Sequence, residues 1–145
     1  MKTLTIVRHA KSSWNTNHED HDRPLNTRGL EAAPRVGAEI LRRGMVPDKI
    51  ISSTAVRAAT TAQLIAKEIG IQFSELVYNK ELYLANISDY EEVIKRTEED
   101  AAIDHLMIVS HNPGSHEFSH YLVNDNVIDR FITCSVSMIK LHIDY

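Results

Sequence analysis

The sequence predicts an α/β protein with a largely parallel central sheet, and three observations carry this prediction. Short β-rich runs alternate along the chain with longer segments of helical periodicity. Gly44 and Gly70 stand where two of the helical patterns stop, as is common at helix ends. The composition, with 43% hydrophobic and 25% charged residues, is ordinary for a globular protein. We therefore expect a three-layer α/β/α sandwich, with helices on both faces of the sheet.

Several short runs are candidates for strands. They are residues 4–7, 49–52, 73–78 and 105–110, followed by the segment 130–143, which can hold one or two strands. In that last segment the apolar positions change phase, which suggests a bulge or a strand covered on both faces.

The helical patterns fall between these runs. Helices are expected over residues 28–43, from a cap at Ser53 or Thr54 up to Gly70, from Ser88 to about Glu99, and near residues 115–123. The first has an apolar face made of Leu30, Ala33, Gly37, Ile40 and Leu41. Pro34 lies inside this pattern and predicts a kink or a late start. The second helix is rich in alanine and can lie close to a sheet, while the third is polar and should form a solvated outer face.

Length and charge narrow the classes of function. The 145 residues suit one domain, residues 1–145, with a real hydrophobic core. The formal net charge of −4 gives no basic field for nucleic acid or for an anionic membrane. No apolar run approaches the ~20 residues of a membrane span, and the N-terminus lacks the pattern of a signal peptide. The single cysteine, Cys134, cannot form an intrachain disulfide and is expected as a small buried residue, so a cytoplasmic location is expected.

Four of the predicted strands lead to residues that can carry chemistry. The first ends on Arg8-His9, and the second precedes a helix whose first turn holds Arg57. The third leads to Glu81, and the fourth ends at His111. Because ligands bind at the carboxyl ends of parallel strands, two arginines, two histidines and one carboxylate are expected to converge on one site.

This set of side chains suits phosphoryl transfer. The reaction needs positive groups around three equatorial oxygens and a nucleophile in line. An arginine is always charged, and its fork can bind two oxygens. A neutral histidine can be the nucleophile and form a covalent intermediate, while a carboxylic acid can protonate the leaving group. Since the arginines supply the positive charge, no metal or other cofactor is expected.

Two features beside this set have alternative interpretations. The segment NHEDHD, residues 17–22, contains histidines and carboxylates that suit a divalent metal ion, but it lacks regular spacing. We interpret it as a solvated loop near the mouth of the pocket, with Asp22 and Arg23 as a simple pair. Trp14 either lines the pocket or wedges the loop.

At these residues the chain resembles the histidine phosphatase superfamily, which has the phosphoglycerate-mutase-like fold and an R-H-G signature. The signature is Arg8-His9-Ala10 here, and the string RHAKSSW is similar to that of the small SixA-type phosphohistidine phosphatases. Further similar motifs follow in order: Arg23-Pro24-Leu25-Asn26 with Arg28-Gly29, Ser52-Ser53-Thr54-Ala55 with Arg57-Ala58 and Thr61-Ala62, Leu82-Tyr83-Leu84-Ala85, and His111-Asn112-Pro113-Gly114. The resemblance covers nearly the whole chain.

The resemblance implies roles for the central residues. His9 would be the nucleophile that becomes phosphohistidine, and Arg8 and Arg57 would bind the phosphoryl oxygens. His111 would donate to the phosphoryl group. His9 must be neutral to attack, and the two arginines disfavour its charged form, whereas His111 can act as a protonated donor, depending on the bound anion.

The resemblance also implies three further contacts with the substrate. Asn15 matches a position whose amide often contacts phosphate, and Asn112 is a candidate contact at the rim. Glu81 lies where many members of the superfamily place the general acid, although the SixA-type branch is less uniform there.

Three functions remain open from the sequence. The first is a phosphatase that acts on phosphohistidine in a protein, and the second is a phosphatase for a small phosphate ester such as a sugar or metabolite phosphate. The third is a non-catalytic module that binds phosphate. Because the connections between elements are short, a shallow and open site is expected, which favours a protein substrate and makes a mutase unexpected. The expected partner is therefore a phosphorylated protein or a small phosphorylated metabolite, and neither nucleic acid nor a membrane.

Overall fold

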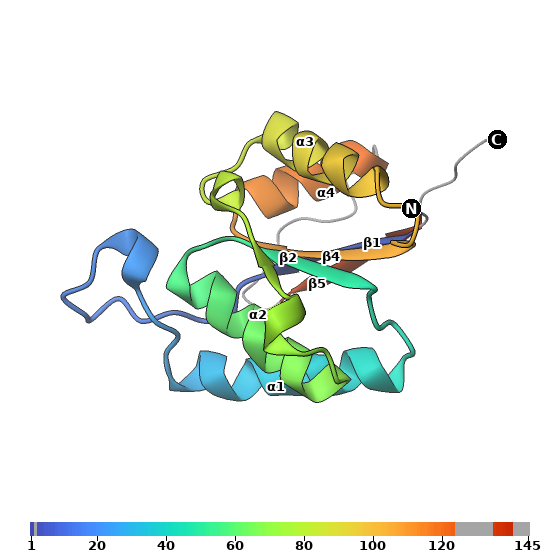
Figure 1. Ribbon diagram of the computed structural model, residues 1–145. Coiled ribbons are helices and arrows are strands. Elements are labelled where there is room, and N and C mark those ends of the chain that lie inside the picture. Colours follow the sequence, from blue (N-terminus) through green and yellow to red (C-terminus); the bar gives the residue numbers. More distant parts are fainter. Residues whose placement is uncertain (2, 124–134, 141–145) are drawn as a thin grey trace.

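The expected three-layer α/β/α sandwich is present in the computed structural model (Figure 1), which describes residues 1, 3–123 and 135–140. Within these residues the sheet has five strands in the order β3-β2-β4-β1-β5. They are β1 (Thr3–Arg8), β2 (Lys49–Ser52), β3 (Val77–Tyr78), β4 (His105–Ser110) and β5 (Val136–Lys140). The first four run parallel and β5 pairs antiparallel with β1, so the sheet is mostly parallel, as predicted.

Two pairs of helices cover the two faces of the sheet (Figure 1). One face is covered by α1 (Thr27–Arg42) and α2 (Val56–Ile69), and the other by α3 (Ile87–Glu98) and α4 (Gly114–Val123). Successive side chains of a strand point to opposite faces, so both faces of β4 are buried. Leu106 packs with Tyr90 and Phe118 on one side, and Met107 packs with Ile65 on the other. In the described part of the chain, no helix is long and apolar enough to cross a membrane.

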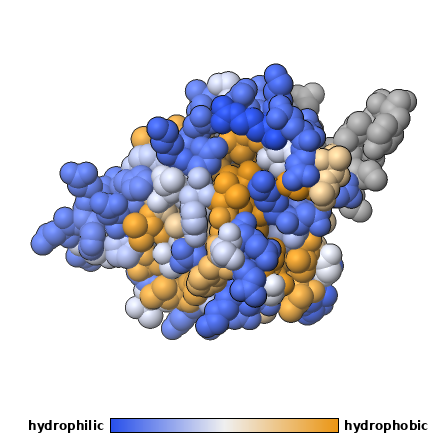
Figure 2. Space-filling model, in the orientation of Figure 1, coloured by the Kyte–Doolittle hydropathy of each residue, from blue (hydrophilic) through white to orange (hydrophobic). Residues whose placement is uncertain are grey.

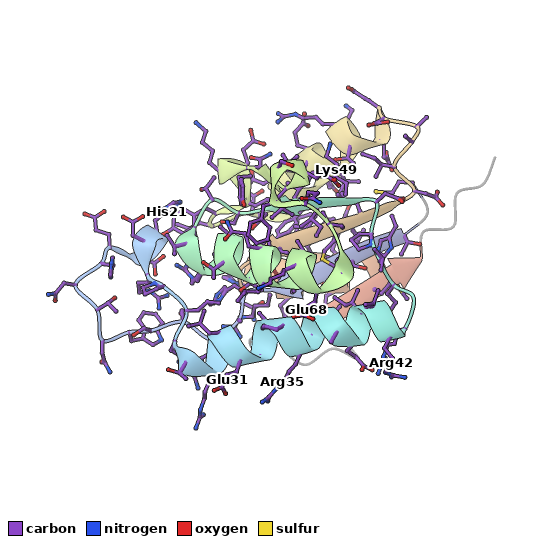
Figure 3. All side chains as sticks on the ribbon, turned by 60° about the horizontal axis from the view of Figure 1, so that its bottom comes forward. His21, Glu31, Arg35, Arg42, Lys49 and Glu68 are labelled. Carbon is purple, nitrogen blue, oxygen red and sulfur yellow. The ribbon has the colours of Figure 1, made fainter. Side chains whose placement is uncertain are left out.

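The apolar face predicted for α1 is partly wrong. Gly29, Ala33, Gly37 and Ile40 are buried, whereas Leu30 and Leu41 are half-exposed. The reason is a close approach of α1 to α2, because a Cβ added to Gly37 would lie 2.8 Å from the Cβ of Glu68. Small side chains therefore make this contact, while Glu31, Arg35 and Arg42 project outward from α1 (Figure 3).

The predicted helix starts need correction. Asn26 caps α1 by accepting a hydrogen bond from the backbone N–H of Gly29, and the helix runs through Pro34 without a late start. Asn86, rather than Ser88, caps α3 and forms a capping box with Asp89. No side chain caps α2, since Ala55 holds that position. The hydroxyls of Ser53 and Thr54, which were expected as caps, contact histidines instead.

The third predicted strand is much shorter than expected. Residues 73–75 form a 3-10 helix, and only Val77–Tyr78 pairs with β2. Phe73, Val77 and Tyr78 are all exposed at this edge of the sheet, so their β propensity is not reinforced by a core. In the last predicted segment β5 is a strand, whereas Cys134 and the remaining residues up to 134 and from 141 lie outside the described residues.

Candidate active site

Three neighbouring strands deliver the central residues to one edge of the sheet. Arg8 at the end of β1 lies opposite Ser110 at the end of β4. The backbone N–H of His9 donates to the carbonyl of Ser110 at 3.0 Å, and that of Ser53 donates to Val109 at 2.9 Å. The residues that follow the three strands are therefore fixed side by side. The imidazole rings of His9 and His111 lie 5.1 Å apart between centroids.

These residues line a cavity of about 320 Å³. Its lining consists of Arg8, His9, Lys11, Ser12, Trp14, Asp20, Arg23, Arg57, Leu84, His111 and Asn112. Burial gives the cavity a direction, because His9, Arg57 and His111 are 7%, 4% and 5% exposed, whereas Trp14 and Leu84 are 77% and 72% exposed. The three buried residues form the interior, and the two exposed ones stand at the mouth.

The structure brings together five of the seven residues predicted from the sequence. Arg8, His9, Arg57, His111 and Asn112 all line the cavity.

Two of the predicted residues are not brought to the cavity. Asn15 is exposed on the loop and is absent from the lining. Glu81 lies in the 3-10 helix Lys80–Leu82, and its carboxylate is 3.3 Å from the guanidinium of Arg96 on α3. The carboxylate that does enter the cavity is Asp20.

The ring of His9 is oriented by its own neighbour. Its Nδ1 lies 2.7 Å from the carbonyl oxygen of Ala10, which can only accept, so Nδ1 carries the proton and Nε2 keeps a lone pair. The N–H of Ala10 donates to the hydroxyl of Thr61, which donates in turn to the carbonyl of Arg57. Ala10, which replaces the usual glycine of the signature, is fully buried in this link between β1 and α2.

His9 is neutral at physiological pH. Burial is the largest cause that lowers its pKa, and the charges of Arg57, Arg8 and Arg23 lower it further, while the hydrogen bond to Ala10 opposes them. The result is a pKa of about 4. A neutral imidazole agrees with the sequence-based expectation, although burial outweighs the arginines as its cause.

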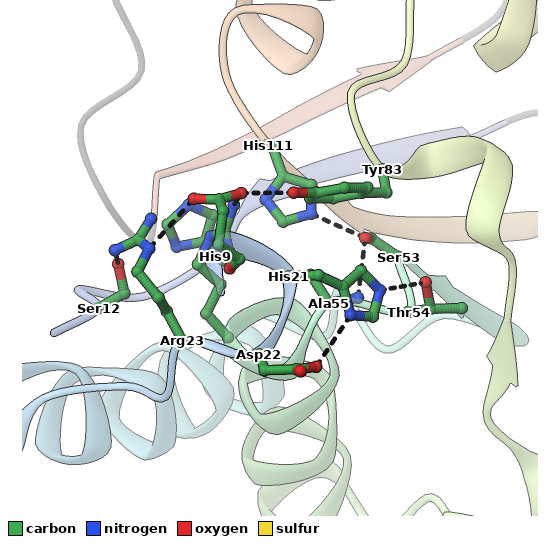
Figure 4. A network of polar contacts seen from close by, with 12 residues as sticks. His9, Ser12, His21, Asp22, Arg23, Ser53, Thr54, Ala55, Tyr83 and His111 are labelled. Atoms are coloured by element: carbon green, nitrogen blue, oxygen red, sulfur yellow. Dashed lines mark hydrogen bonds and ion pairs between the residues drawn. The ribbon is translucent and has the colours of Figure 1, made fainter. Parts of the chain in front are cut away.

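His111 is held in one tautomer by Ser53. Its Nε2 lies 2.7 Å from the Ser53 hydroxyl oxygen, which also accepts from the N–H of Ala55 at 3.2 Å (Figure 4). Among the described residues the Ser53 proton has no other acceptor than His111, so we assign it to Nε2, which places the imidazole proton on Nδ1. Burial, followed by the charges of His9 and Arg57, lowers the pKa of His111 to about 3. In this environment His111 is neutral and its Nδ1–H is the available donor, whereas a protonated His111 beside a bound anion stays a prediction.

Asp20 is the main residue of the site that the sequence did not single out. It accepts hydrogen bonds from Arg57 Nη2 at 3.1 Å, from Arg23 Nε at 3.1 Å and from the Tyr83 hydroxyl at 2.5 Å. Its backbone carbonyl also accepts from Arg57 Nη1 at 2.6 Å. The predicted pair of Asp22 and Arg23 is wrong, because Asp22 contacts His21 at 3.2 Å (Figure 4) and Arg23 binds Asp20.

The two interpretations of Trp14 both hold. Trp14 lines the cavity, and the guanidinium carbon of Arg23 lies 3.6 Å from the centroid of its ring. Arg23 also donates to the Ser12 hydroxyl at 2.8 Å and to the carbonyl of Ser13 at 3.1 Å. Trp14 and Arg23 thereby hold the loop after β1 in place.

The loop of residues 11–26 projects from the side of the molecule (Figure 1) and presents a mostly hydrophilic surface (Figure 2). It agrees with the expected loop near the mouth of the pocket, since Asp20 lines the cavity from it. Among the described residues, no three His, Cys, Asp or Glu side chains are grouped so as to hold a metal ion.

Comparison with known proteins agrees with this geometry. The family model of the histidine phosphatase superfamily, branch 1, matches residues 4–117. The chain belongs to this superfamily. Among solved structures, the SixA protein of Agrobacterium tumefaciens, a candidate phosphohistidine phosphatase, is 28% identical with a TM-score of 0.83, and the match covers 96% of this chain and 90% of that one. The expected SixA-type branch is thereby confirmed.

Other matches define the limits of the likeness. The protein histidine phosphatase SixA complexed with tungstate has a TM-score of 0.85 at 16% identity, covering 96% of this chain and 88% of that one, and shares the fold alone. An uncharacterized chloroplastic protein of Arabidopsis thaliana is 25% identical, over 96% of this chain and 66% of its own length. A 2,3-bisphosphoglycerate-dependent phosphoglycerate mutase of Parvibaculum lavamentivorans is 31% identical, over 68% of this chain and 47% of its own. The chain thus spans about two thirds of the first of these two relatives and about half of the second.

Proposed function

We propose that the protein is a phosphatase that transfers a phosphoryl group to His9 and then hydrolyses the phosphohistidine. The observation that carries this proposal is the orientation of His9, whose Nδ1 is bound to the Ala10 carbonyl at 2.7 Å, so that the lone pair of Nε2 is available in a cavity lined by arginines. A neutral, fixed imidazole is a competent nucleophile for phosphoryl transfer.

The walls of the cavity carry donors for the phosphoryl oxygens. Arg57 Nε and His111 Nδ1 are buried and make no hydrogen bond to any residue that the structure describes. Buried donors are rarely left unpaired, so the lack of a protein partner for these two atoms, on residues that line the cavity, supports an anion as their partner. Arg8 lines the same cavity and adds a second guanidinium. These groups would stabilise the negative charge of the equatorial oxygens during transfer.

The substrate that we infer is phosphohistidine on a protein. Trp14 and Leu84 stand at the mouth, 77% and 72% exposed, so the rim offers apolar side chains to a large partner. Leu84 has a φ of 55°, a left-handed conformation that is unfavourable for a leucine. Such strain is typically retained where it serves a site, and here it accompanies the exposed side chain at the rim.

A small phosphorylated metabolite is the second candidate. The cavity of about 320 Å³ falls in the range of small-ligand sites, and Lys11 at its lining offers a further cation to an anionic molecule. The two candidates differ in what the rim contacts, because a metabolite would be held inside the cavity and a protein would also cover Trp14 and Leu84.

Kinetics on a phosphohistidine-carrying protein and on a panel of sugar phosphates would decide between them. We expect a higher kcat/KM for the phosphohistidine protein, with His9→Ala abolishing hydrolysis of both classes and His18→Ala, on the exposed loop, as the matched control. Hydrolysis retained in His9→Ala would remove the covalent mechanism. A kcat/KM that is higher for a sugar phosphate would assign the metabolite function, and binding of phosphate without turnover would indicate a non-catalytic module.

A further inference from the structure

Asp20 presents an anion in a cavity whose proposed substrate is itself an anion. Its carboxylate oxygens accept three hydrogen bonds, from Arg57, Arg23 and Tyr83. Two of these reach Oδ2 and one reaches Oδ1. A carboxylate has about four acceptor positions, so one position on Oδ1 accepts no hydrogen bond from the described residues. The Tyr83 hydrogen bond is the largest cause that lowers the pKa of Asp20 to about 2, and burial opposes it. The charge of Arg57 and the hydrogen bonds of both arginines lower the pKa further, so Asp20 is ionised at neutral pH.

Asp20 lies nearer the mouth of the cavity than His9, Arg57 and His111 do. His9, Arg57 and His111 are each at most 7% exposed, whereas the side chain of Asp20 is 46% exposed. In an in-line transfer the leaving group lies on the side of phosphorus opposite the nucleophile. With His9 in the interior, that side is the mouth, where Asp20 stands.

We propose that Asp20 contacts the leaving group and selects an imidazole, by accepting a hydrogen bond from the ring N–H of a phosphohistidine. This proposal rests on the proposed function and names the feature of the site that distinguishes phosphoramidates from phosphate esters. The ring N–H concerned belongs to the nitrogen that does not carry the phosphoryl group.

The transfer balances without a proton from the protein. In a phosphoimidazole with a proton on its free nitrogen the ring is cationic, and the Asp20 carboxylate stabilises this positive charge. As His9 Nε2 forms a bond to phosphorus, the P–N bond of the substrate breaks and its electron pair returns to the substrate nitrogen, which gives a neutral imidazole. His9 becomes a phosphoimidazolium whose Nδ1–H is bound by the Ala10 carbonyl. Water then attacks phosphorus, and both of its protons stay with the phosphate. The electron pair of the broken P–N bond returns to Nε2 of His9.

An ester leaving group gains nothing from this arrangement. An alkoxide needs a proton, which an ionised Asp20 does not hold, and an anionic leaving group is repelled by the carboxylate. The same residue therefore favours one class of substrate and disfavours the other.

The test compares phosphoimidazole with p-nitrophenyl phosphate, whose leaving group departs without protonation. In Asp20→Asn we expect the ratio of kcat/KM for phosphoimidazole to kcat/KM for p-nitrophenyl phosphate to fall by about tenfold or more, as for loss of a hydrogen bond between charged groups. Asp20→Glu should restore part of the ratio. The matched control is Asp22→Asn, in the same 3-10 helix (Asp20–Asp22), which should leave both rates unchanged.

Each other outcome has a definite meaning. Equal losses on both substrates in Asp20→Asn would show that Asp20 only positions Arg57, and unchanged rates on both would show no contact with the leaving group; either result overturns the proposal while leaving the phosphatase function intact. A wild-type enzyme that hydrolyses the ester but not phosphoimidazole would remove the proposed phosphohistidine substrate together with this inference.

Discussion

At the level of single residues, the hydroxyl of Ser53 determines which ring nitrogen of the neutral His111 carries the proton. Ser53 is fully buried and lies directly after β2, so its position is set by the sheet. Its donation to Nε2 places the imidazole proton on Nδ1, which is the nitrogen that makes no hydrogen bond to the described residues. Ser53 is in this sense a positioning residue.

Removal of this hydroxyl should impair catalysis without disturbing the fold. In Ser53→Ala the proton of His111 is free to move to Nε2, and Nδ1 then presents a lone pair to the phosphoryl oxygens. We expect kcat/KM for an aryl phosphate to fall by about 10- to 100-fold, the range for one hydrogen bond to a charged group. Ser52→Ala is the control, because the Ser52 hydroxyl donates to the carbonyl of Ser53 and is bonded to neither histidine in the described structure. ¹⁵N NMR of His111 would report the tautomer directly, and an unchanged tautomer with an unchanged rate would contradict the assignment.

The sequence revealed the residues of the site by type and by strand end, but did not reveal their partners. His9 and His111 follow neighbouring parallel strands. Because ligands bind at the carboxyl ends of such strands, the sequence was enough to predict that the two histidines share a site. Asp20 lies 37 residues from Arg57 and 63 from Tyr83 in the sequence, so no local sequence pattern predicts their contacts. Its acidic neighbours are typical of a solvated loop, and the carboxylate that the sequence named for the site was Glu81, which lies outside the cavity lining.

At the level of elements, the segment after β1 is held in place by the start of α1. Ser12 and Leu25 form an antiparallel bridge, and the N–H of Asn26 donates to the carbonyl of Lys11 at 2.9 Å. Gly29 allows this approach, because an added Cβ would lie 2.2 Å from the same carbonyl oxygen. The first turn of α1 thus supports Lys11 and Ser12, which line the cavity.

Gly29→Ala should therefore destabilise the protein although alanine is the better helix former. In an isolated helix the exchange would stabilise by about 1 kcal/mol, whereas the clash with the Lys11 backbone should cost about 1–3 kcal/mol. We expect a lower Tm and a lower kcat/KM, since Lys11 and Ser12 line the cavity. Arg35→Ala, on the outward face of α1 (Figure 3), should change neither quantity appreciably. A Gly29→Ala variant as stable and active as the parent would show that the loop shifts freely.

The type and order of the elements could be predicted, whereas their contacts and ends could not. Alternation of β-rich and helical segments gave the correct layers. The buried face of α1 was partly wrong because Gly37 meets Glu68 of another helix, and no periodicity within α1 contains that information. The strand predicted around Phe73 was longer than the observed one, because its residues lie at a sheet edge, where few contacts stabilise extended structure.

At the level of the whole molecule, the active site couples folding to pH. His9 and His111 have pKa values lowered to about 4 and about 3, from the ordinary value of 6.5 for histidine. Between these values and 6.5 the unfolded chain binds more protons than the folded one. The free energy of unfolding is therefore undiminished above pH 6.5 and decreases as the pH falls toward the folded-state values, by at most ~1.4 kcal/mol per pH unit for each histidine.

Urea unfolding between neutral pH and about pH 5 would measure this coupling. We expect stability to fall with pH in the wild type, and the slope to be smaller in His9→Gln, which lacks one buried imidazole whose protonation the folded state opposes. His18→Gln, on the exposed loop, should keep the wild-type slope. If His9→Gln and the wild type lost stability at the same rate, His9 would be protonated as readily in the folded chain as in the unfolded one. A protonated His9 has no lone pair on Nε2, so that result would also mean that the nucleophile is lost below pH 6.5 rather than near pH 4.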